Sequence, residues 1–305
     1  MKKLAARILG RPRGWNLARA PAGSSFVLLS RGRTRYRLEG PSEGPLLLLV
    51  HGMTYPLEVW NMQVPALVGA GFRVLRYDLW GRGFSEFKRG RLDLEILARQ
   101  PLELLQVLGE GGAVHACSLS NSDLVLSRLF RLAPARLRSI TWISPSAYDP
   151  RTQKASIRFM GALPLLRGLL ARRLRRTLVG RMEGHRAGLP SGVSSEVLDV
   201  YAASLACARE SPVFAAAVVK ALRHLPSAAA MSRDFHLLAQ SDLPLLALRF
   251  GGEQDADPAT LERTLETIPQ LEQVQIPGGG HMGLLDEAPA VNAALLSFLA
   301  RREAG

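Results

Sequence analysis

The chain is poor in cysteine and has no long apolar segment. Its 305 residues include only two cysteines, Cys117 and Cys207, and no apolar run long enough to cross a membrane. Two cysteines form neither a disulfide framework nor a cysteine-rich zinc site, so a reducing compartment such as the cytoplasm is the expected location.

Motifs for metals and nucleotides are also missing. The chain has six histidines, and three of them, His185, His224 and His236, show no metal-ligand spacing. Neither a phosphate-binding loop nor a dinucleotide-binding glycine pattern occurs in the sequence. We therefore expect no cofactor, no metal and no nucleic-acid partner.

Acidic residues are scarce in two stretches of a chain whose net charge is +13. Residues 1–37 carry ten Lys and Arg and no acidic residue, and residues 151–186 carry ten with Glu183 as the one acid. The rest of the chain is therefore net acidic. Such basic segments suggest an anionic partner: a lipid surface at the membrane periphery, a phosphate-bearing substrate or an acidic carrier protein. A purely solvated surface explains the same charges.

Strand and helix signals alternate along most of the chain. Apolar segments typical of buried strands occupy residues 46–50, 73–77, 114–117 and 137–143, after two strands at 26–30 and 34–39. Helical spacing fills the intervals at residues 58–70, 92–108 and 124–132. The alternation resumes after residue 241, with strands at 243–250 and 271–276. This pattern predicts an α/β fold, a mostly parallel central sheet flanked by helices.

The rhythm breaks between residues 146 and 241, a region rich in helical spacing and poor in strand signals. We predict three parts: a basic N-terminal extension over residues 1–25, a core formed by residues 26–145 and 242–305, and an inserted helical cap over residues 146–241. The apolar cap residues, Phe159, Met160 and Leu163 among them, suggest a pocket for an apolar acyl or aromatic part of a substrate, and packing of the cap on the core is the equal alternative.

The stretch V-H-A-C-S-L-S-N-S-D, residues 114–123, indicates a short buried strand that turns sharply into a helix on small residues. A serine at such a turn lies above the sheet, and the backbone N–H groups of the following helix point to the atom that it attacks. Ordinary capping of the helix is the alternative reading, since Ser, Asn and Asp are preferred at helix starts. His115, in the middle of the strand, is expected to be a buried core histidine.

Four stretches in this order resemble the α/β-hydrolase family, specifically its esterase and lipase-like members with an inserted cap. They are H-G-M-T at residues 51–54, D-L-W-G-R-G-F-S at 78–85, the serine stretch, and I-P-G-G-G-H-M at 276–282. The resemblance covers residues 46–145 and 243–300. It implies the family's fold and a Ser-His-Asp triad in the chain order Ser, Asp, His.

The resemblance assigns the nucleophile to Ser120, because family members often read V-H-L-V-G-L-S-M-G-G across this region, with Ser118 as the alternative. It assigns the oxyanion donors to the backbone of Met53 and Asn121. Glycine or another small residue usually stands where this chain has Ser118, Ser122 and Asp123. These residues would make the site narrower, lower its catalytic rate, change its reaction or abolish its activity.

The resemblance also assigns the general base and its acid. His281 corresponds to the family's C-terminal histidine, and Asp255 fits the G-x-x-D pattern, with Asp257 and Glu253 as alternatives. Asp78 and Arg82 are expected to hold the loop after their strand.

The sequence is compatible with two classes of function. The first is a serine hydrolase that cleaves a carboxylic ester or thioester through an acyl-enzyme. The second is a catalytically altered member that binds a ligand or performs acyl transfer, cyclisation or lyase chemistry.

Overall fold

The computed structural model describes residues 20–88, 90–146, 164–189, 191–211, 213–224, 228–253 and 258–303. Its centre is an eight-stranded sheet in the order β1-β2-β4-β3-β5-β6-β7-β8. The strands are β1 (Ser25–Leu29), β2 (Gly32–Glu39), β3 (Leu46–Val50), β4 (Arg73–Tyr77), β5 (Val114–Leu119), β6 (Leu137–Ile143), β7 (Leu245–Phe250) and β8 (Leu271–Ile276). All pairs from β4 to β8 are parallel, so the predicted mostly parallel sheet is confirmed.

The centre of the sheet is apolar because helices cover both of its faces. All five residues of β3, L-L-L-L-V, are buried between β4 and β5. The edge differs: β1 and β2 form an antiparallel hairpin, and in β1 Leu29 is buried while Leu28 is exposed.

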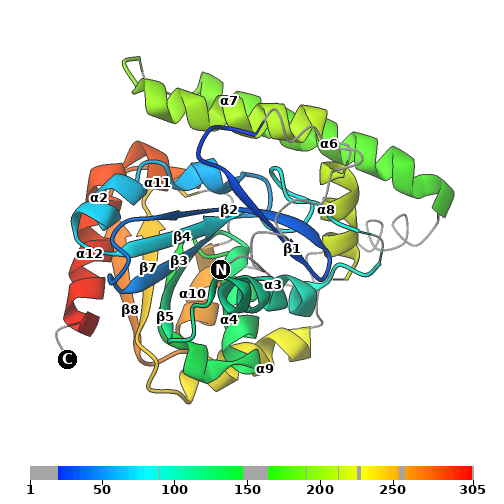
Figure 1. Ribbon diagram of the computed structural model, residues 1–305. Helices are drawn as coiled ribbons and strands as arrows, with labels where there is room; N and C mark the ends of the chain where they lie inside the picture. The colour runs from blue at the N-terminus through cyan, green and yellow to red at the C-terminus, as the bar shows by residue number, and fades with distance from the viewer. Residues whose placement is uncertain are drawn as a thin grey trace.

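Helices form a layer on each face of the sheet (Figure 1). The apolar side chains of α3 (Leu94–Leu108), α4 (Ser122–Leu132), α9 (Ala228–Ala239) and α10 (Pro258–Leu265) join one core cluster. Those of α2 (Val64–Gly69), α11 (Gly283–Asp286) and α12 (Ala288–Glu303) join the other. A short 3-10 helix, η3 (Pro134–Arg136), precedes β6.

One element differs from the sequence-based expectation. A single helix over residues 58–70 was predicted, but the structure has a 3-10 helix, η2 (Leu57–Trp60), followed by α2. The prediction was wrong because Pro65 lies in the first turn of α2. Proline has no N–H to donate and its ring crowds the preceding helical turn, so it disfavours a helix interior and suits a first turn, as Pro65 does in α2, although α3 accommodates Pro101 in its interior.

The described residues between β6 and β7 form four helices, in the region where a cap was predicted. Three of them, α6 (Pro164–Ala187), α7 (Ser195–Glu210) and α8 (Phe214–Arg223), pack together above the sheet in Figure 1. The fourth, α9, packs against α4, where Arg128 Nε donates to Asp234 Oδ2 at 2.7 Å. It therefore belongs to the layer that covers the sheet. Residues 1–19, most of the predicted N-terminal extension, lie outside the described part of the chain.

No single helix in the described ranges is long and apolar enough to cross a membrane. One pair, Ser195–Glu210 with Phe214–Ala221, meets that test jointly across an 87° bend. Many of the apolar residues of this pair, including Val200 and Phe214, belong to the buried core, so packing within the protein accounts for their apolar character.

Candidate active site

The site is organised around the turn between β5 and α4. Ser120 follows β5 directly and has a φ of +55°, in the left-handed region that non-glycine residues seldom adopt. Its N–H donates to Ile143 O at 2.9 Å, which ties the turn to the end of β6. Ser118, by contrast, is a fully buried residue inside β5, paired with Val50 and Trp142 on the neighbouring strands. Of the two serines, Ser120 is the one at the apex.

The loop after β3 lies beside this turn because β3 and β5 are neighbouring parallel strands. His51 is fully buried: its Nε2 accepts from Leu79 N at 2.8 Å and its Nδ1 lies 2.6 Å from Gly52 O. Burial lowers the pKa of His51 to about 3, so the ring is neutral and its two bonds fix the loop. No backbone hydrogen bond among the described residues uses the N–H of Met53 or of Asn121.

The two substitutions after the apex make specific contacts. Ser122 Oγ donates to His51 O at 2.6 Å, so this serine joins the start of α4 to the loop after β3. Asp123 is buried and accepts from Leu124 N at 2.6 Å and from Ser146 N at 2.8 Å. Burial raises the pKa of Asp123 to about 7, against the lowering effect of these hydrogen bonds.

His281 lies on the loop that follows β8. Its Nδ1 is 2.8 Å from Glu253 Oε2, and its backbone oxygen accepts from Ser144 Oγ at 3.2 Å. Glu253 is one of the two alternative acids that the sequence offered beside Asp255. Asp255, the acid that the resemblance assigned, and Asp257 both lie outside the described residues.

The loop after β4 is held by a buried cluster of charged residues. Arg35 is buried, with Asp78 Oδ2 at 3.4 Å and Glu58 Oε2 at 3.2 Å. Asp78 also accepts from Leu57 N and Phe84 N, each at 2.8 Å. Burial raises the pKa of Asp78 to about 6, against the lowering effect of Arg35. This buried cluster joins β2, η2 and the loop after β4.

The structure shows why the motif at residues 78–85 has glycine at position 83 and arginine at position 82. A Cβ on Gly83, which has a φ of +50°, would lie 2.1 Å from Asp78 Oδ2, so no larger residue fits. Arg82 is buried and its Nε donates to Met53 O at 3.3 Å. Burial lowers the pKa of Arg82 to about 10, a value at which it remains a cation at neutral pH. Arg82 therefore positions the backbone of Met53, in addition to holding its own loop.

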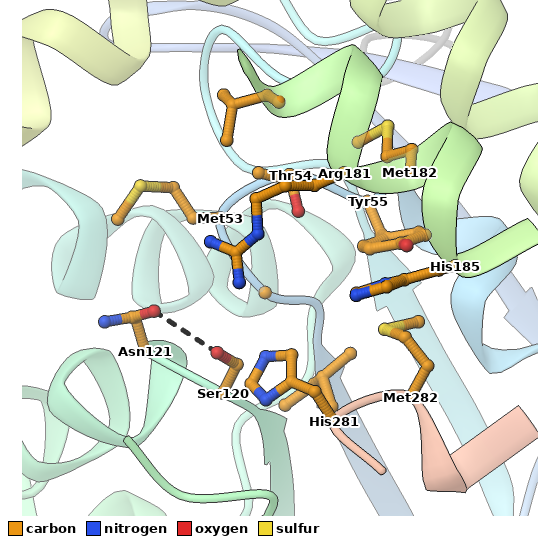
Figure 2. A pocket seen from close by; sticks show the side chains of 13 residues that line it. Met53, Thr54, Tyr55, Ser120, Asn121, Arg181, Met182, His185, His281 and Met282 are labelled. Carbon is orange, nitrogen blue, oxygen red and sulfur yellow. Dashed lines mark hydrogen bonds between the residues drawn. The ribbon is translucent and has the colours of Figure 1, made fainter. Parts of the chain in front are cut away.

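A pocket of about 150 Å³ opens between the turn and α6. Figure 2 shows Ser120 and His281 on its floor, with the side chains of Arg181 and His185 pointing into it from α6. The Ser120 hydroxyl donates to Asn121 Oδ1 at 3.2 Å. The lining is completed by Gly52, Met53, Thr54, Tyr55, Leu119, Asn121, Leu178, Met182 and Met282.

Comparison with known proteins identifies the family to which the chain belongs. The family described as "Alpha/beta hydrolase family" matches residues 47–294, most of the chain. The chain belongs to the α/β-hydrolase family. This α/β-hydrolase is 26% identical over 283 residues to a protein of Variovorax paradoxus named "Putative carbamate hydrolase RutD", an alignment that covers 87% of this chain and 96% of the relative.

Solved structures agree with this assignment. A hydrolase from Pseudomonas aeruginosa PA01 has a TM-score of 0.70 and 25% identity, with 92% of this chain and 99% of the other covered. The enol-lactonase from Burkholderia xenovorans LB400 also has a TM-score of 0.70, at 20% identity, with 90% and 99% covered, and it supports the fold alone. The family and its hydrolase relatives make this chain an enzyme, a hydrolase.

Two residues that line the hydrolase's pocket were missed by the sequence analysis. Arg181 was counted only as part of a basic segment, and His185 only as a histidine without metal-ligand spacing. Their spacing of four residues, which places both on one side of a helix, was the available signal. Their distance in sequence from Ser120 gave no indication that this side faces the pocket.

His115 lies away from the pocket, and the histidines do not form a metal site with other described residues. His115 is buried in β5, with its Nδ1 2.7 Å from Ser139 Oγ and its Nε2 2.8 Å from Glu303 Oε1, as expected of a core histidine. Within the part of the chain that the structure describes, no group of three or more histidine, cysteine or acidic residues is placed to hold a metal ion.

Proposed function

We propose that this enzyme is a serine hydrolase that cleaves a carboxylic ester or thioester, with Ser120 as nucleophile and His281 as general base. The observation that carries the proposal is the strained turn that presents Ser120 to the same pocket as His281. Ser118, inside β5 and outside the pocket lining, does not offer its hydroxyl to a substrate.

The geometry supports a two-step mechanism. Glu253, as a carboxylate, accepts from Nδ1–H of His281, which leaves Nε2 able to take the proton of the Ser120 hydroxyl. Ser120 Oγ attacks the carbonyl carbon, and the Met53 and Asn121 N–H groups stabilise the oxygen that becomes negative. The imidazolium then gives its proton to the leaving alcohol or thiol as the carbon–oxygen or carbon–sulfur bond breaks.

Water completes the cycle. His281 takes a proton from a water molecule, whose oxygen attacks the carbonyl of the acyl-enzyme. Collapse of this second intermediate breaks the bond to Ser120, which recovers its proton from His281, and releases the carboxylic acid.

In this proposal α6, α7 and α8 form the cap, with α6 as the part that covers the nucleophile. The apolar lining residues, Met53, Leu178 and Met182 among them, suit a short apolar acyl part. Phe159, Met160 and Leu163 lie outside the described residues. The exposed arginines of α6 suit an anionic partner, either a lipid surface or an acidic carrier protein.

Labelling with a fluorophosphonate probe tests the nucleophile, because the probe needs an activated serine and no particular substrate. We expect the wild-type protein to be labelled, Ser120→Ala to lose labelling, and Ser118→Ala to keep it. The melting temperature of each variant serves as a control for folding. Loss of labelling in Ser118→Ala alone would assign the nucleophile to Ser118.

A further inference from the structure

One helix places two nitrogen-rich side chains opposite the nucleophile. Arg181 and His185 are four residues apart on α6, and both line the pocket that contains Ser120. In Figure 2 the Arg181 guanidinium points down toward Ser120 and His281, and the His185 ring points into the pocket beside it. Both side chains therefore face the space where the substrate of the proposed hydrolase would bind.

The chemistry of the lining favours an anion. None of the described residues that line the pocket is an aspartate or glutamate, whereas Arg181 is a permanent cation. Asp286 of α11 interacts with His185 but is not a lining residue. The Nδ1 of His185 is buried and has no hydrogen-bond partner among the described residues. A ligand oxygen would satisfy this nitrogen.

The size of the pocket favours a small anion, and a carboxylate is the smallest group that matches the planar guanidinium, which pairs with phosphate in the same way. The planar guanidinium offers parallel N–H donors that match the two oxygens of a carboxylate. A volume of about 150 Å³ is in the range of a cavity that holds one benzene molecule, so the pocket suits a substrate of only a few carbon atoms. Apolar side chains such as Leu178 and Met182 surround this short span.

We infer that the enzyme acts on small esters or thioesters that carry a carboxylate a few bonds from the reacting carbonyl, and that Arg181 binds this carboxylate. The inference rests on the proposed function, since it places the reacting carbonyl at Ser120. Arg181 is then a specificity-determining residue, and His185 is a second donor to the same group.

The test compares two esters of similar length with different charge, monoethyl succinate and ethyl pentanoate, by titration of the acid released. A second pair, acetoxyacetate and propyl acetate, differs in charge on the alcohol part of the ester, whereas the first pair differs on the acyl part. We expect the wild-type enzyme to prefer the carboxylate ester of at least one pair. Arg181→Gln should lower that preference, measured as the ratio of kcat/KM values, about 10- to 100-fold. Arg181→Lys, which keeps the charge but not the planar fork, should restore part of it.

Arg176→Gln is the matched control. Arg176 is an exposed arginine of the same helix that does not line the pocket, so its variant should keep the wild-type ratio. Calorimetric binding of succinate to the wild type, Arg181→Gln and Arg176→Gln gives a second readout that needs no turnover. Weaker binding in Arg181→Gln alone supports the inference.

The outcomes separate this inference from the proposed function. Hydrolysis of both esters with the same ratio in the wild type and in Arg181→Gln, together with equal succinate binding, overturns the anion site and leaves the serine hydrolase standing. A wild-type enzyme that is neither labelled by the probe nor active on any of the esters contradicts the proposed function. In that case succinate binding tests the anion site by itself. Binding that depends on Arg181 supports the anion site, and absence of binding overturns it.

Discussion

At position 120 the backbone is held in a conformation that costs a non-glycine residue about 1–3 kcal/mol. Such strain persists only where the surroundings fix it. Here the Ser120 N–H donates to Ile143 O, and Ser122 Oγ donates to His51 O two residues further on. Ser122, at a position where the resemblance leads us to expect glycine or another small residue, thus joins the turn to the loop that would form the oxyanion site.

The residue that orients His281 can be identified by substitution. Because Glu253 contacts Nδ1, Glu253→Gln should disturb the tautomer and position of the ring and lower kcat/KM roughly 10²- to 10⁴-fold. Steady-state kinetics with a neutral ester measures this loss. Asp255→Asn, two residues further along the chain, is the matched variant, and a larger loss there than at Glu253 would give the role to Asp255, as the sequence resemblance predicted.

Asp123 should make stability depend on pH. Burial raises its pKa to about 7 from an unfolded value near 3.8, so between these values the folded state holds a proton that the unfolded state has released. The free energy of unfolding contributed by this group therefore falls as pH rises from about 4 to 7, by up to about 1.4 kcal/mol per pH unit.

Urea unfolding of the wild type and of Asp123→Asn at several pH values measures this effect. The Asn variant cannot lose the proton, so the stability difference between the two proteins should shift against the wild type as pH rises. A difference that stays constant from pH 4 to pH 8 would show that Asp123 does not titrate in this range.

At the scale of single elements, α6 carries arginines in different roles. Arg181 lines the pocket, whereas Arg175 Nη2 donates to Ser211 O at 2.8 Å and so joins α6 to the end of α7. Arg172, Arg173, Arg176 and Arg186 are exposed and do not line the pocket. A surface partner would meet these four.

Charge reversal of two exposed arginines tests the anionic partner. If α6 docks on an anionic surface, Arg172→Glu with Arg176→Glu should weaken co-sedimentation with vesicles that contain phosphatidylserine. Added salt should weaken it in the wild type, since screening acts over a Debye length of about 8 Å at physiological ionic strength. Pull-down with an acidic carrier protein distinguishes the second kind of partner. If the charge reversal changes neither vesicle binding nor carrier-protein binding, this face is ordinary solvated surface.

The sequence predicted elements well where the apolar pattern was strong. The segment at residues 46–50 is uniformly apolar and forms the buried β3, and the serine stretch forms the turn from β5 to α4. Prediction failed at Pro65, where helical spacing was given more weight than the missing N–H. The roles of Arg181 and His185 depend on how α6 lies over the sheet, and no local pattern encodes that tertiary placement.

At the scale of the whole molecule, parallel strands bring distant segments to one edge of the sheet. The loops after β3, β5 and β8 carry Met53, Ser120 and His281, which are more than 200 residues apart in the chain at their extremes, and all three line one pocket. Ligands of open parallel sheets bind at the carboxyl ends of the strands for this reason. The serine hydrolase proposal follows from this convergence.

The most direct measurement is to trap the covalent intermediate. The enzyme is mixed with 4-nitrophenyl acetate, quenched with acid within milliseconds, digested and analysed by mass spectrometry. We predict one acetyl group on the peptide that contains Ser120, located on Ser120 itself, and no such adduct in Ser120→Ala. Turnover without an adduct on Ser120, or an adduct that persists in Ser120→Ala at another residue, would contradict the proposed mechanism.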